Sequence, residues 1–424
     1  MPRGSARIPP EIKDIAHREG VSPEKLRKLL RSGRVVIPSN PRHKNLIPCA
    51  IGEDTRVKIN ANIGTSRDYI DVKEELQKVK VAIRYGADAV MDLSTGGNVP
   101  EIRRKVVRAS TVPVGTVPIY EAACMTSRKG PLSMDSDDLF KTIEAHAKDG
   151  VDFMTVHCGV NRQTAATLKK HKRVTGVVSR GGALLIAWMH ETGLENPLFD
   201  DYDHLLDLAK EHGFALSLGD GLRPGSIADA TDVPQLHELV VLGRLVERAR
   251  KAGVEAMVEG PGHVPLNQIE ANVRIEKAVC RGAPFYVLGP LVSDVGAGYD
   301  HITGAIGGAL AAYFGADFLC YVTPSEHLSL PTVEDVRQGV VASKIAAHAA
   351  DIARGRGLGW DLEMSTARKA LDWNKMYKLS VDPERAAETR RKRGSRSPDV
   401  CSMCGDLCAM KMVDEILKGR ASKR

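Results

Sequence analysis

Short β-branched segments alternate with helical patterns along most of the chain, and this alternation constrains the fold more than any other feature. A strand followed by a helix, repeated eight or nine times, predicts a (β/α)₈ TIM barrel of parallel strands. The candidate strands are RVKIN, DAVMDL, VPVGTV, DFMTVHC, GVVSRGG, FALSLGD, EAMVEG, FYVLGP and FLCYVTP.

The regions on either side of this alternation differ from it in composition. Residues 1–50 contain two amphipathic patterns, PPEIKDIAHREG and SPEKLRKLLRSG, and predict a small helical N-terminal cap. Residues 51–380 carry the barrel. From residue 381 to 424, enrichment in Pro, Gly, Ser and Arg predicts a linker that ends in a cysteine-rich tail.

Composition and charge exclude several classes of protein. There is no run of 18 apolar residues and no apolar secretory segment at the start, so we expect a cytoplasmic protein without a membrane partner. Much of the net charge of +7 lies in RRKRGSRS (390–397) and KGRASKR (418–424). No aromatic residues interleave with these runs, so the stacking surface of a nucleic-acid-binding protein is missing.

Polar residues gather at or just after the carboxyl ends of the candidate strands. In a parallel barrel these ends meet on one face, where active sites are built. A single polar residue at such a position usually only caps the next helix, but the repetition predicts a site. Its candidates are Met91, Tyr120, His157, Ser179–Gly181, Asp220–Arg223, Glu259, His263, Tyr286 and His327.

Two of these strand-end loops are rich in glycine. The stretches SRGG and GDGLRPGS each carry an arginine, Arg180 and Arg223 respectively. Glycines let backbone N–H groups approach a ligand closely, and together with an arginine they favour a phosphorylated substrate. Glycine also serves ordinary turns, which is the alternative for each cluster taken alone.

Two histidines follow strands and precede proline-containing loops: His263 in EGPGHVP and His327 in TPSEHLSLP. They are candidates to share a divalent ion that keeps open positions for water or ligand; the alternative is a pair of ordinary hydrogen-bonding loop histidines. Glu259, four residues before His263, is a candidate acid/base or ribose-binding carboxylate.

The tail contains CSMCGDLC, which places three cysteines within eight residues. A structural zinc site is normally closed by four ligands, whereas a [4Fe–4S] cluster held by three thiolates leaves one iron open to S-adenosylmethionine. The spacing favours a cluster on Cys401, Cys404 and Cys408. Zinc with a distant fourth ligand and redox thiols remain alternatives.

Longer motifs resemble one enzyme family over roughly residues 10–412. They are NANIGTS, VMDLSTGG, PVGTVPIYEA, VSRGG, LSLGDGLRPGSIADA, EGPGHVP, APFYVLGPL, GYDHIT, CYVTPSEHL and KIAAHAADIA, followed by the three-cysteine tail. The chain resembles a short form of the phosphomethylpyrimidine synthase family of radical S-adenosylmethionine enzymes. The resemblance implies a TIM barrel, a homodimer, a lyase acting on 5-aminoimidazole ribotide, and an external electron donor such as flavodoxin or ferredoxin.

The resemblance also assigns roles to residues of this chain. It implies zinc, or another divalent ion, on His263 and His327, and a [4Fe–4S] cluster on Cys401, Cys404 and Cys408. Glu259 and these cysteines are the implied catalytic residues. The implied substrate-binding residues are Asn62, Met91, Tyr120, His157, Ser179, Arg180, Gly181, Asp220, Gly221, Leu222, Arg223, Glu259 and Tyr286.

The product is the point on which the sequence departs from the family. In LVSDVGAGYDHIT, Gly296 and Ala297 replace an alanine and a proline of the usual pattern, which predicts a looser backbone. We therefore expect the paralogous reaction, in which the ribotide becomes 5-hydroxybenzimidazole, the precursor of the cobalamin lower ligand. The alternative product is the pyrimidine phosphate of thiamine biosynthesis. A zinc-stabilised RNA-binding or regulatory protein is a third hypothesis.

Overall fold

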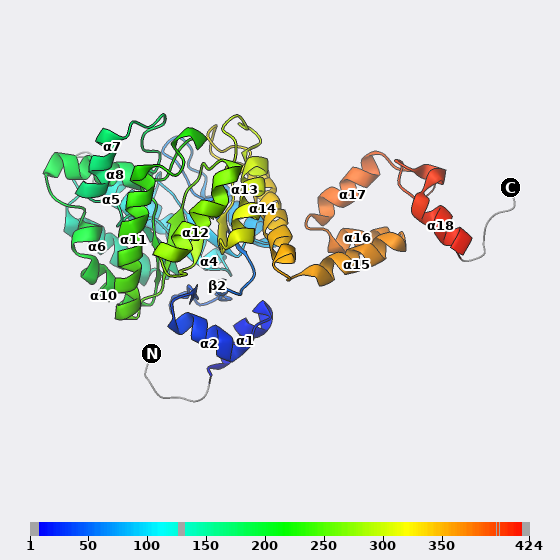
Figure 1. Cartoon of the computed structure of the whole chain (residues 1–424), viewed down its shortest axis with the longest axis horizontal. Helices are drawn as coiled ribbons and strands as arrows, with labels where there is room; N and C mark the ends of the chain where they lie inside the picture. Colours follow the sequence, from blue (N-terminus) through cyan, green and yellow to red (C-terminus); the bar gives the residue numbers. More distant parts are fainter. Residues whose placement is uncertain (1–7, 126–131, 396, 398, 418–424) are drawn as a thin grey trace. The chain divides into compact units, whose positions relative to one another are not determined.

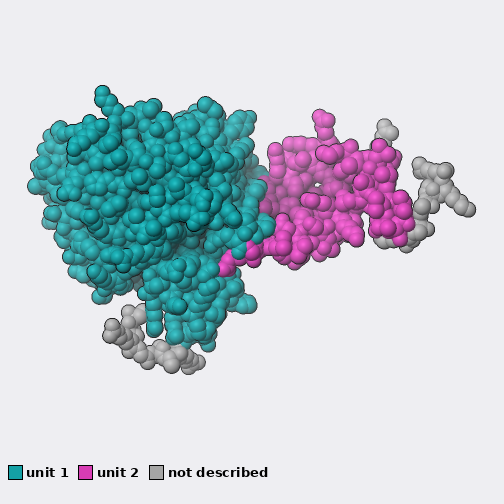
Figure 2. Space-filling model, viewed as in Figure 1, with its two compact units in different colours: residues 1–354 teal, residues 355–424 magenta. Residues whose placement is uncertain are grey.

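The computed structural model describes residues 8–125, 132–395, 397 and 399–417. The chain divides into two compact units, Met1–Arg354 and Gly355–Arg424, coloured separately in Figure 2. The unit that contains the barrel thus ends at Arg354, whereas the sequence placed the last boundary at residue 380. The basic run 418–424 and the first seven residues of the predicted cap lie outside the described residues.

Within the described part of the first unit, eight parallel strands close into a barrel in the order β10-β3-β4-β5-β6-β7-β8-β9. Closure occurs where β10 pairs with β3, with Phe318 opposite Lys58. The predicted TIM barrel is confirmed. Its strands are β3 (Lys58–Ile63), β4 (Ala89–Asp92), β5 (Val114–Thr116), β6 (Phe153–Val156), β7 (Ala215–Leu218), β8 (Ala256–Gly260), β9 (Phe285–Leu288) and β10 (Phe318–Cys320).

The ninth candidate strand, GVVSRGG at 176–182, is wrong. Its last residues begin helix α8 (Arg180–Thr192), and Ser179 is the N-cap, its side chain accepting a hydrogen bond from the Gly182 N–H. The capping serine and the apolar helical run that follows it outweigh the short Val177-Val178 pair, which had suggested a strand.

Helices surround the barrel, as Figure 1 shows. Most begin with an aspartate, asparagine, serine or threonine whose side chain accepts a backbone N–H, as at Asp71, Asp232 and Thr332. The outer helices are α3 (Val72–Arg84), α4 (Val99–Ala109), α6 (Ser136–Lys148), α10 (Tyr202–His212), α11 (Val233–Ala252), α12 (Ile269–Val279), α13 (Asp300–Phe314) and α14 (Val333–Ala353). Shorter helices in the loops are α5 (Pro118–Met125), α7 (Arg162–Lys170), α9 (Pro197–Asp200), η1 (Ile227–Asp229) and η2 (Leu266–Gln268).

The N-terminal segment forms the predicted helices, α1 (Pro10–Glu19) and α2 (Pro23–Arg31), and a two-stranded antiparallel sheet of β1 (Val35–Val36) and β2 (Ile51–Gly52). A buried histidine attaches this segment to the barrel. The two ring nitrogens of His43 lie 2.7 Å from the Asp152 carboxylate and 3.0 Å from the Ser110 carbonyl. Burial disfavours a charged ring, but these two acceptors outweigh it and raise the pKa of His43.

The second unit is built from helices rather than from an irregular linker. It contains α15 (Leu358–Lys369), α16 (Trp373–Leu379), α17 (Pro383–Lys392), η3 (Gly405–Leu407) and α18 (Ala409–Leu417). The expected linker residues from 383 are helical because the Asp382 side chain caps α17 and Pro383 occupies its first turn. None of the helices described in either unit is long and apolar enough to cross a membrane.

Candidate active site at the carboxyl end of the barrel

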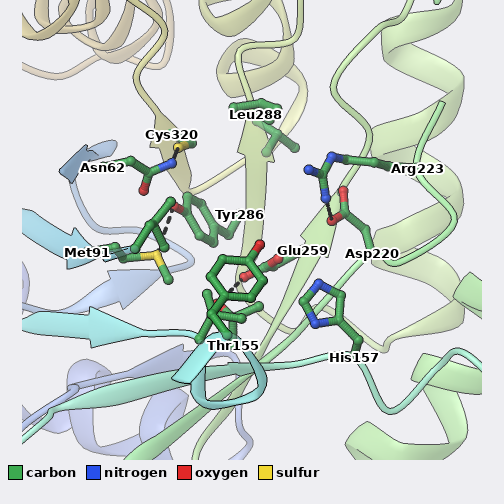
Figure 3. A pocket seen from close by; sticks show the side chains of 15 residues that line it. Asn62, Met91, Thr155, His157, Asp220, Arg223, Glu259, Tyr286, Leu288 and Cys320 are labelled. Atoms are coloured by element: carbon green, nitrogen blue, oxygen red, sulfur yellow. Dashed lines mark hydrogen bonds and ion pairs between the residues drawn. The ribbon is translucent and has the colours of Figure 1, made fainter. Parts of the chain in front are cut away.

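A pocket with about 510 Å³ of space, counted out to its open mouth, lies among the barrel strands. Each of the eight strands, or the loop that directly follows it, contributes a side chain, and Figure 3 shows these side chains converging. The lining residues are Asn62, Met91, Leu93, Val117, Tyr120, Thr155, His157, Asp220, Arg223, Glu259, Gly260, Tyr286, Val287, Leu288 and Cys320.

Glu259, near the end of β8, is held at one of its two oxygens. The hydroxyl groups of Thr155 and Ser217, on the neighbouring strands β6 and β7, donate to Glu259 Oε1 at 2.6 and 2.7 Å. Burial raises the pKa of Glu259 despite these donors. A carboxyl group fixed in this way, with its pKa raised, is a candidate for proton exchange with a bound molecule.

The loop after β7 places a second carboxyl group beside an arginine. Arg223 Nη1 donates to Asp220 Oδ1 at 3.1 Å, while burial raises the pKa of Asp220 to about 7. The backbone N–H groups of Gly221 and Leu222 donate to Glu238 of α11 at 2.8 and 2.7 Å. These contacts fix the loop that presents the Asp220–Arg223 pair to the pocket.

His157 is almost completely buried, and its Nδ1 atom has no hydrogen-bond partner within the described residues. Burial, together with the positive charge of Arg223, lowers the pKa of His157 to about 3, so the ring is neutral. A side chain at Gly181 would lie 2.2 Å from this ring. Glycine at position 181 therefore lets α8 approach the His157 ring closely.

The inner end of the pocket is a hydrogen-bonded network. Asn60 donates to the Tyr286 hydroxyl at 2.7 Å and to Asn62 Oδ1 at 2.8 Å, and Asn62 donates to the Cys320 sulfur at 3.2 Å. Tyr286 lies near the start of β9 rather than at its end, and its hydroxyl reaches Met91 at 3.5 Å. These contacts place polar and sulfur atoms at defined positions against a bound molecule.

The start of α8 lies beside the pocket. The Arg180 guanidinium stacks over the Tyr120 ring at 4.8 Å from its centre. A side chain at Gly182 would meet the Gly221 carbonyl oxygen at 2.3 Å, so the start of α8 packs directly on the 220–223 loop. Arg180 and a helix N-terminus together favour an anionic group here.

The structure brings most of the predicted substrate residues into one pocket. Asn62, Met91, Tyr120, His157, Asp220, Arg223, Glu259 and Tyr286 line it. Ser179, Arg180, Gly181, Gly221 and Leu222 do not line it; they form the neighbouring α8 start and the 220–223 loop. Their role in binding stays a prediction.

Sequence reasoning missed several lining residues. Thr155 lies on β6, two positions before His157, which directly follows that strand, so continuing the strand alternation could have found it. Cys320, the last residue of β10, was not singled out by the strand-end pattern. The other residues missed are Val117, Gly260, Val287 and Leu288.

The two predicted metal histidines face each other. His263 Nε2 and His327 Nε2 lie 3.3 Å apart, and His263 Nδ1 lies 2.8 Å from Asp294 Oδ1. An N–H on Nδ1 that donates to this carboxylate leaves Nε2 as a lone pair directed at the other ring. Two nitrogens bound to one tetrahedral zinc at ~2.0–2.1 Å lie about 3.4 Å apart, so the pair has the spacing of two metal ligands.

The three tail cysteines lie on one short turn in the second unit. Backbone N–H groups of Cys404 and Met403 donate to the Cys401 sulfur and lower its pKa, which favours the thiolate that iron requires. Cys404 is exposed and Cys408 is buried. In the described ranges, no three His, Cys, Asp or Glu side chains already converge as a metal site.

A family model described as the radical SAM ThiC family matches residues 3–415. The chain belongs to this family. Radical SAM enzymes use S-adenosylmethionine with a [4Fe–4S] cluster, so family membership supports the cluster over the zinc and redox-thiol alternatives for the tail. It also speaks against the RNA-binding hypothesis.

Curated relatives named phosphomethylpyrimidine synthase are similar to this chain over nearly its whole length. The relative from Carboxydothermus hydrogenoformans is 59% identical, over 96% of this chain and 95% of its own. Those from Moorella thermoacetica and Desulforamulus reducens are 57% and 55% identical over the same shares. A solved dihydropteroate synthase of Xanthomonas albilineans aligns over 76% of this chain and 100% of its own, with 12% identity and a TM-score of 0.43.

The expected benzimidazole product is not supported, because these relatives carry the name of the pyrimidine-forming enzyme. The loop at 293–298, on which that expectation depended, is also held by hydrogen bonds. The Tyr299 N–H donates to the Gly296 carbonyl at 2.7 Å, and Asp294 contacts both His263 and the Ile227 N–H. Replacing proline by Ala297 thus leaves a loop that is still held at both ends.

Proposed function

We propose that this chain is a radical S-adenosylmethionine lyase that converts 5-aminoimidazole ribotide into 4-amino-5-hydroxymethyl-2-methylpyrimidine phosphate, the pyrimidine precursor of thiamine. The observation that carries the proposal is the identity of 54–59% to phosphomethylpyrimidine synthases over 95–97% of their length. The mixed polar and apolar pocket of Figure 3 supports it, because it matches a small polar substrate.

Cys401, Cys404 and Cys408 are the residues proposed to hold the cluster, since they supply three thiolates on one turn and leave a fourth position open. When bound, the cluster and S-adenosylmethionine supply a 5′-deoxyadenosyl radical that removes a hydrogen atom from the ribotide. The barrel residues hold the ribotide in place for that step and keep water away from it.

The pocket offers a distinct partner for each part of the ribotide. Arg180 and the start of α8, beside the pocket, are proposed to bind the phosphate, and the Asp220–Arg223 pair together with Glu259 is proposed to bind the ribose hydroxyls. The neutral His157 ring lines the pocket and is proposed to hydrogen-bond the base. Met91, Leu288 and Val117 provide apolar surface around it.

Glu259 is the residue proposed to move a proton. Its Oε1 atom accepts hydrogen bonds from two hydroxyl groups, and burial raises its pKa, which favours a carboxyl group that can exchange a proton with the substrate. The rearrangement of the ribotide requires proton transfers that a group of this kind provides.

His263 and His327 are proposed to hold zinc or another divalent ion. Their 3.3 Å nitrogen separation and the Asp294 partner support this assignment. Because the proposed reaction is radical rather than hydrolytic, the ion would position substrate or cofactor. We also propose a cytoplasmic homodimer that receives electrons from a flavodoxin or ferredoxin, because a [4Fe–4S] enzyme needs a reducing compartment and an external reductant.

The test is anaerobic incubation of the reconstituted protein with 5-aminoimidazole ribotide, S-adenosylmethionine and dithionite, followed by mass spectrometry. We expect the pyrimidine phosphate and 5′-deoxyadenosine, and neither of them when S-adenosylmethionine is omitted. Release of 5-hydroxybenzimidazole without the pyrimidine would contradict the proposed product.

A further inference from the structure

The loop of residues 293–298 carries a carboxylate that touches two parts of the active site. Asp294 Oδ1 lies 2.8 Å from His263 Nδ1, in the proposed metal pair. The same carboxylate accepts the backbone N–H of Ile227, at 3.0 Å to Oδ2 and 3.3 Å to Oδ1. One side chain therefore contacts both the metal pair and the long loop after β7.

The hydrogen bond from the Ile227 N–H to Asp294 takes the place of a helix N-cap. Ile227 begins the short helix η1, and Ser226 at its N-cap position makes no side-chain hydrogen bond to it. Asp294 supplies that acceptor from a different loop. At the far end of η1, Asp229 accepts the backbone N–H groups of Val174 and Thr175 at 2.8 and 3.0 Å. The segment that follows Asp220–Arg223 is thus fixed at two points by carboxylates.

We propose that Asp294 is a positioning residue that couples the His263–His327 metal pair to the substrate loop. The inference rests on the metal site of the proposed function. By accepting the Nδ1 proton of His263, Asp294 directs Nε2 towards the ion. Because its carboxylate also holds Ile227, the position of His263 and the position of the loop that presents Asp220 and Arg223 depend on the same side chain.

Asp300 provides the comparison within the same site. Its Oδ2 atom lies 3.6 Å from His327 Nδ1, so it orients the second histidine less tightly, and no contact joins its side chain to the 220–230 loop within the described residues. Asp294 and Asp300 are thus two carboxylates behind one metal pair, of which Asp294 alone is linked to substrate-binding residues in the described structure.

The experiment compares D294N, D300N and H263A in the full-length reconstituted chain. Zinc affinity is measured by competition with a fluorescent chelator, and hydrogen exchange is measured on the peptide that contains Ile227. D203N serves as the charge-loss control, because Asp203 lies on the outer helix α10 and pairs only with the surface Arg248 among the contacts of the described chain.

We expect D294N to weaken zinc binding by about 10–100-fold and to speed exchange at Ile227, at an unchanged Tm. D300N should weaken zinc binding without changing exchange at Ile227. H263A should abolish zinc binding and speed exchange at Ile227, but less than D294N does, since Asp294 still accepts the Ile227 N–H. D203N should change neither quantity.

Two results would overturn the proposal in distinguishable ways. If H263A abolishes zinc binding while D294N leaves both zinc affinity and exchange at wild-type values, the coupling is wrong and the metal pair stands. If H263A leaves zinc binding unchanged, the metal pair itself is wrong, and the role of Asp294 fails with it.

Discussion

The barrel pocket and the cysteine tail differ in how completely the chain alone has arranged them. In the pocket, Glu259 is held by two hydroxyl groups, and the 220–223 loop is held by Glu238. In the described part of the second unit, the apolar side chains that are fully buried are only those of Ala367, Met376, Val400 and Cys408. The three cysteines lie on one turn, but they do not converge as a ready metal site.

The substrate pocket and the proposed cluster site therefore differ in how far the folded chain arranges their residues before a ligand or cluster binds. The barrel can hold its polar groups in place because a large core supports them. A unit with little buried apolar surface has low local stability. Binding of a metal cluster would bring its three cysteine side chains together. Substitutions in the two regions test this difference.

The largest effect is expected from C404A. Iron content and 5′-deoxyadenosine formation should fall to background, while the thermal unfolding of the barrel stays unchanged, because Cys404 is exposed and outside the barrel core. Metal analysis, product chromatography and calorimetry check this. The control is C49A, whose buried thiol is far from the tail in sequence and belongs to the barrel core: it should keep iron and activity and cost about 1–2 kcal/mol of stability. Retention of iron by C404A would contradict the assignment.

A pair of substitutions at the two ends of β8 tests the pocket. E259Q should lower the rate of product formation by about 10²–10⁴-fold, because the proton-exchanging group is removed while the fold is kept. E255Q changes a carboxyl group at the opposite end of the strand, where Glu255 accepts the Ile37 N–H at 2.7 Å. It should keep full activity and lose about 1 kcal/mol of stability. Single-turnover kinetics and urea unfolding separate the two, and equal activity losses would show that the strand end has no special role.

The pH dependence of stability tests whether the barrel contains carboxyl groups that stay protonated. Burial raises the pKa of Glu276, on α12, to about 8, against the opposing charge of Lys277. Between about pH 4.5 and 8 the folded protein holds this proton and the unfolded chain releases it, so the free energy of unfolding falls as pH rises. E276Q should remove a slope of up to about 1.4 kcal/mol per pH unit. Urea unfolding at several pH values checks this, and parallel curves for the two proteins would contradict it.

The smallest effect is expected at the hydroxyl donors of Glu259. S217A removes one of the two donors, at 2.7 Å, and should lower the rate about 5–10-fold, equivalent to about 1 kcal/mol. T155V should act similarly, and the double variant should lose more than either. Rate measurements with saturating ribotide decide the matter. A rate unchanged in the double variant would show that Glu259 needs no support from its neighbours.

Much of the fold could be predicted because its signals are local. The alternation of strand and helix patterns identified all eight barrel strands, and in the structure residues such as Ser22 and Asp232 cap helix starts. The failure at GVVSRGG has the same local origin, since two valines before a capping serine suit a strand as well as a helix entry. The cysteine spacing predicted a cluster site for the same reason, because Cys401, Cys404 and Cys408 are close together in the sequence.

The sequence by itself therefore determined the barrel, the order of its strands along the chain, the cysteine triad and the family. Only the tertiary structure decided which strand-end side chains meet. It placed Tyr286 in the pocket from the start of β9, brought Cys320 to Asn62, and set Asp294 between His263 and Ile227. The physical reason is that the register of a closed barrel and the packing of its loops join residues far apart in the chain, and no short sequence pattern records those distances.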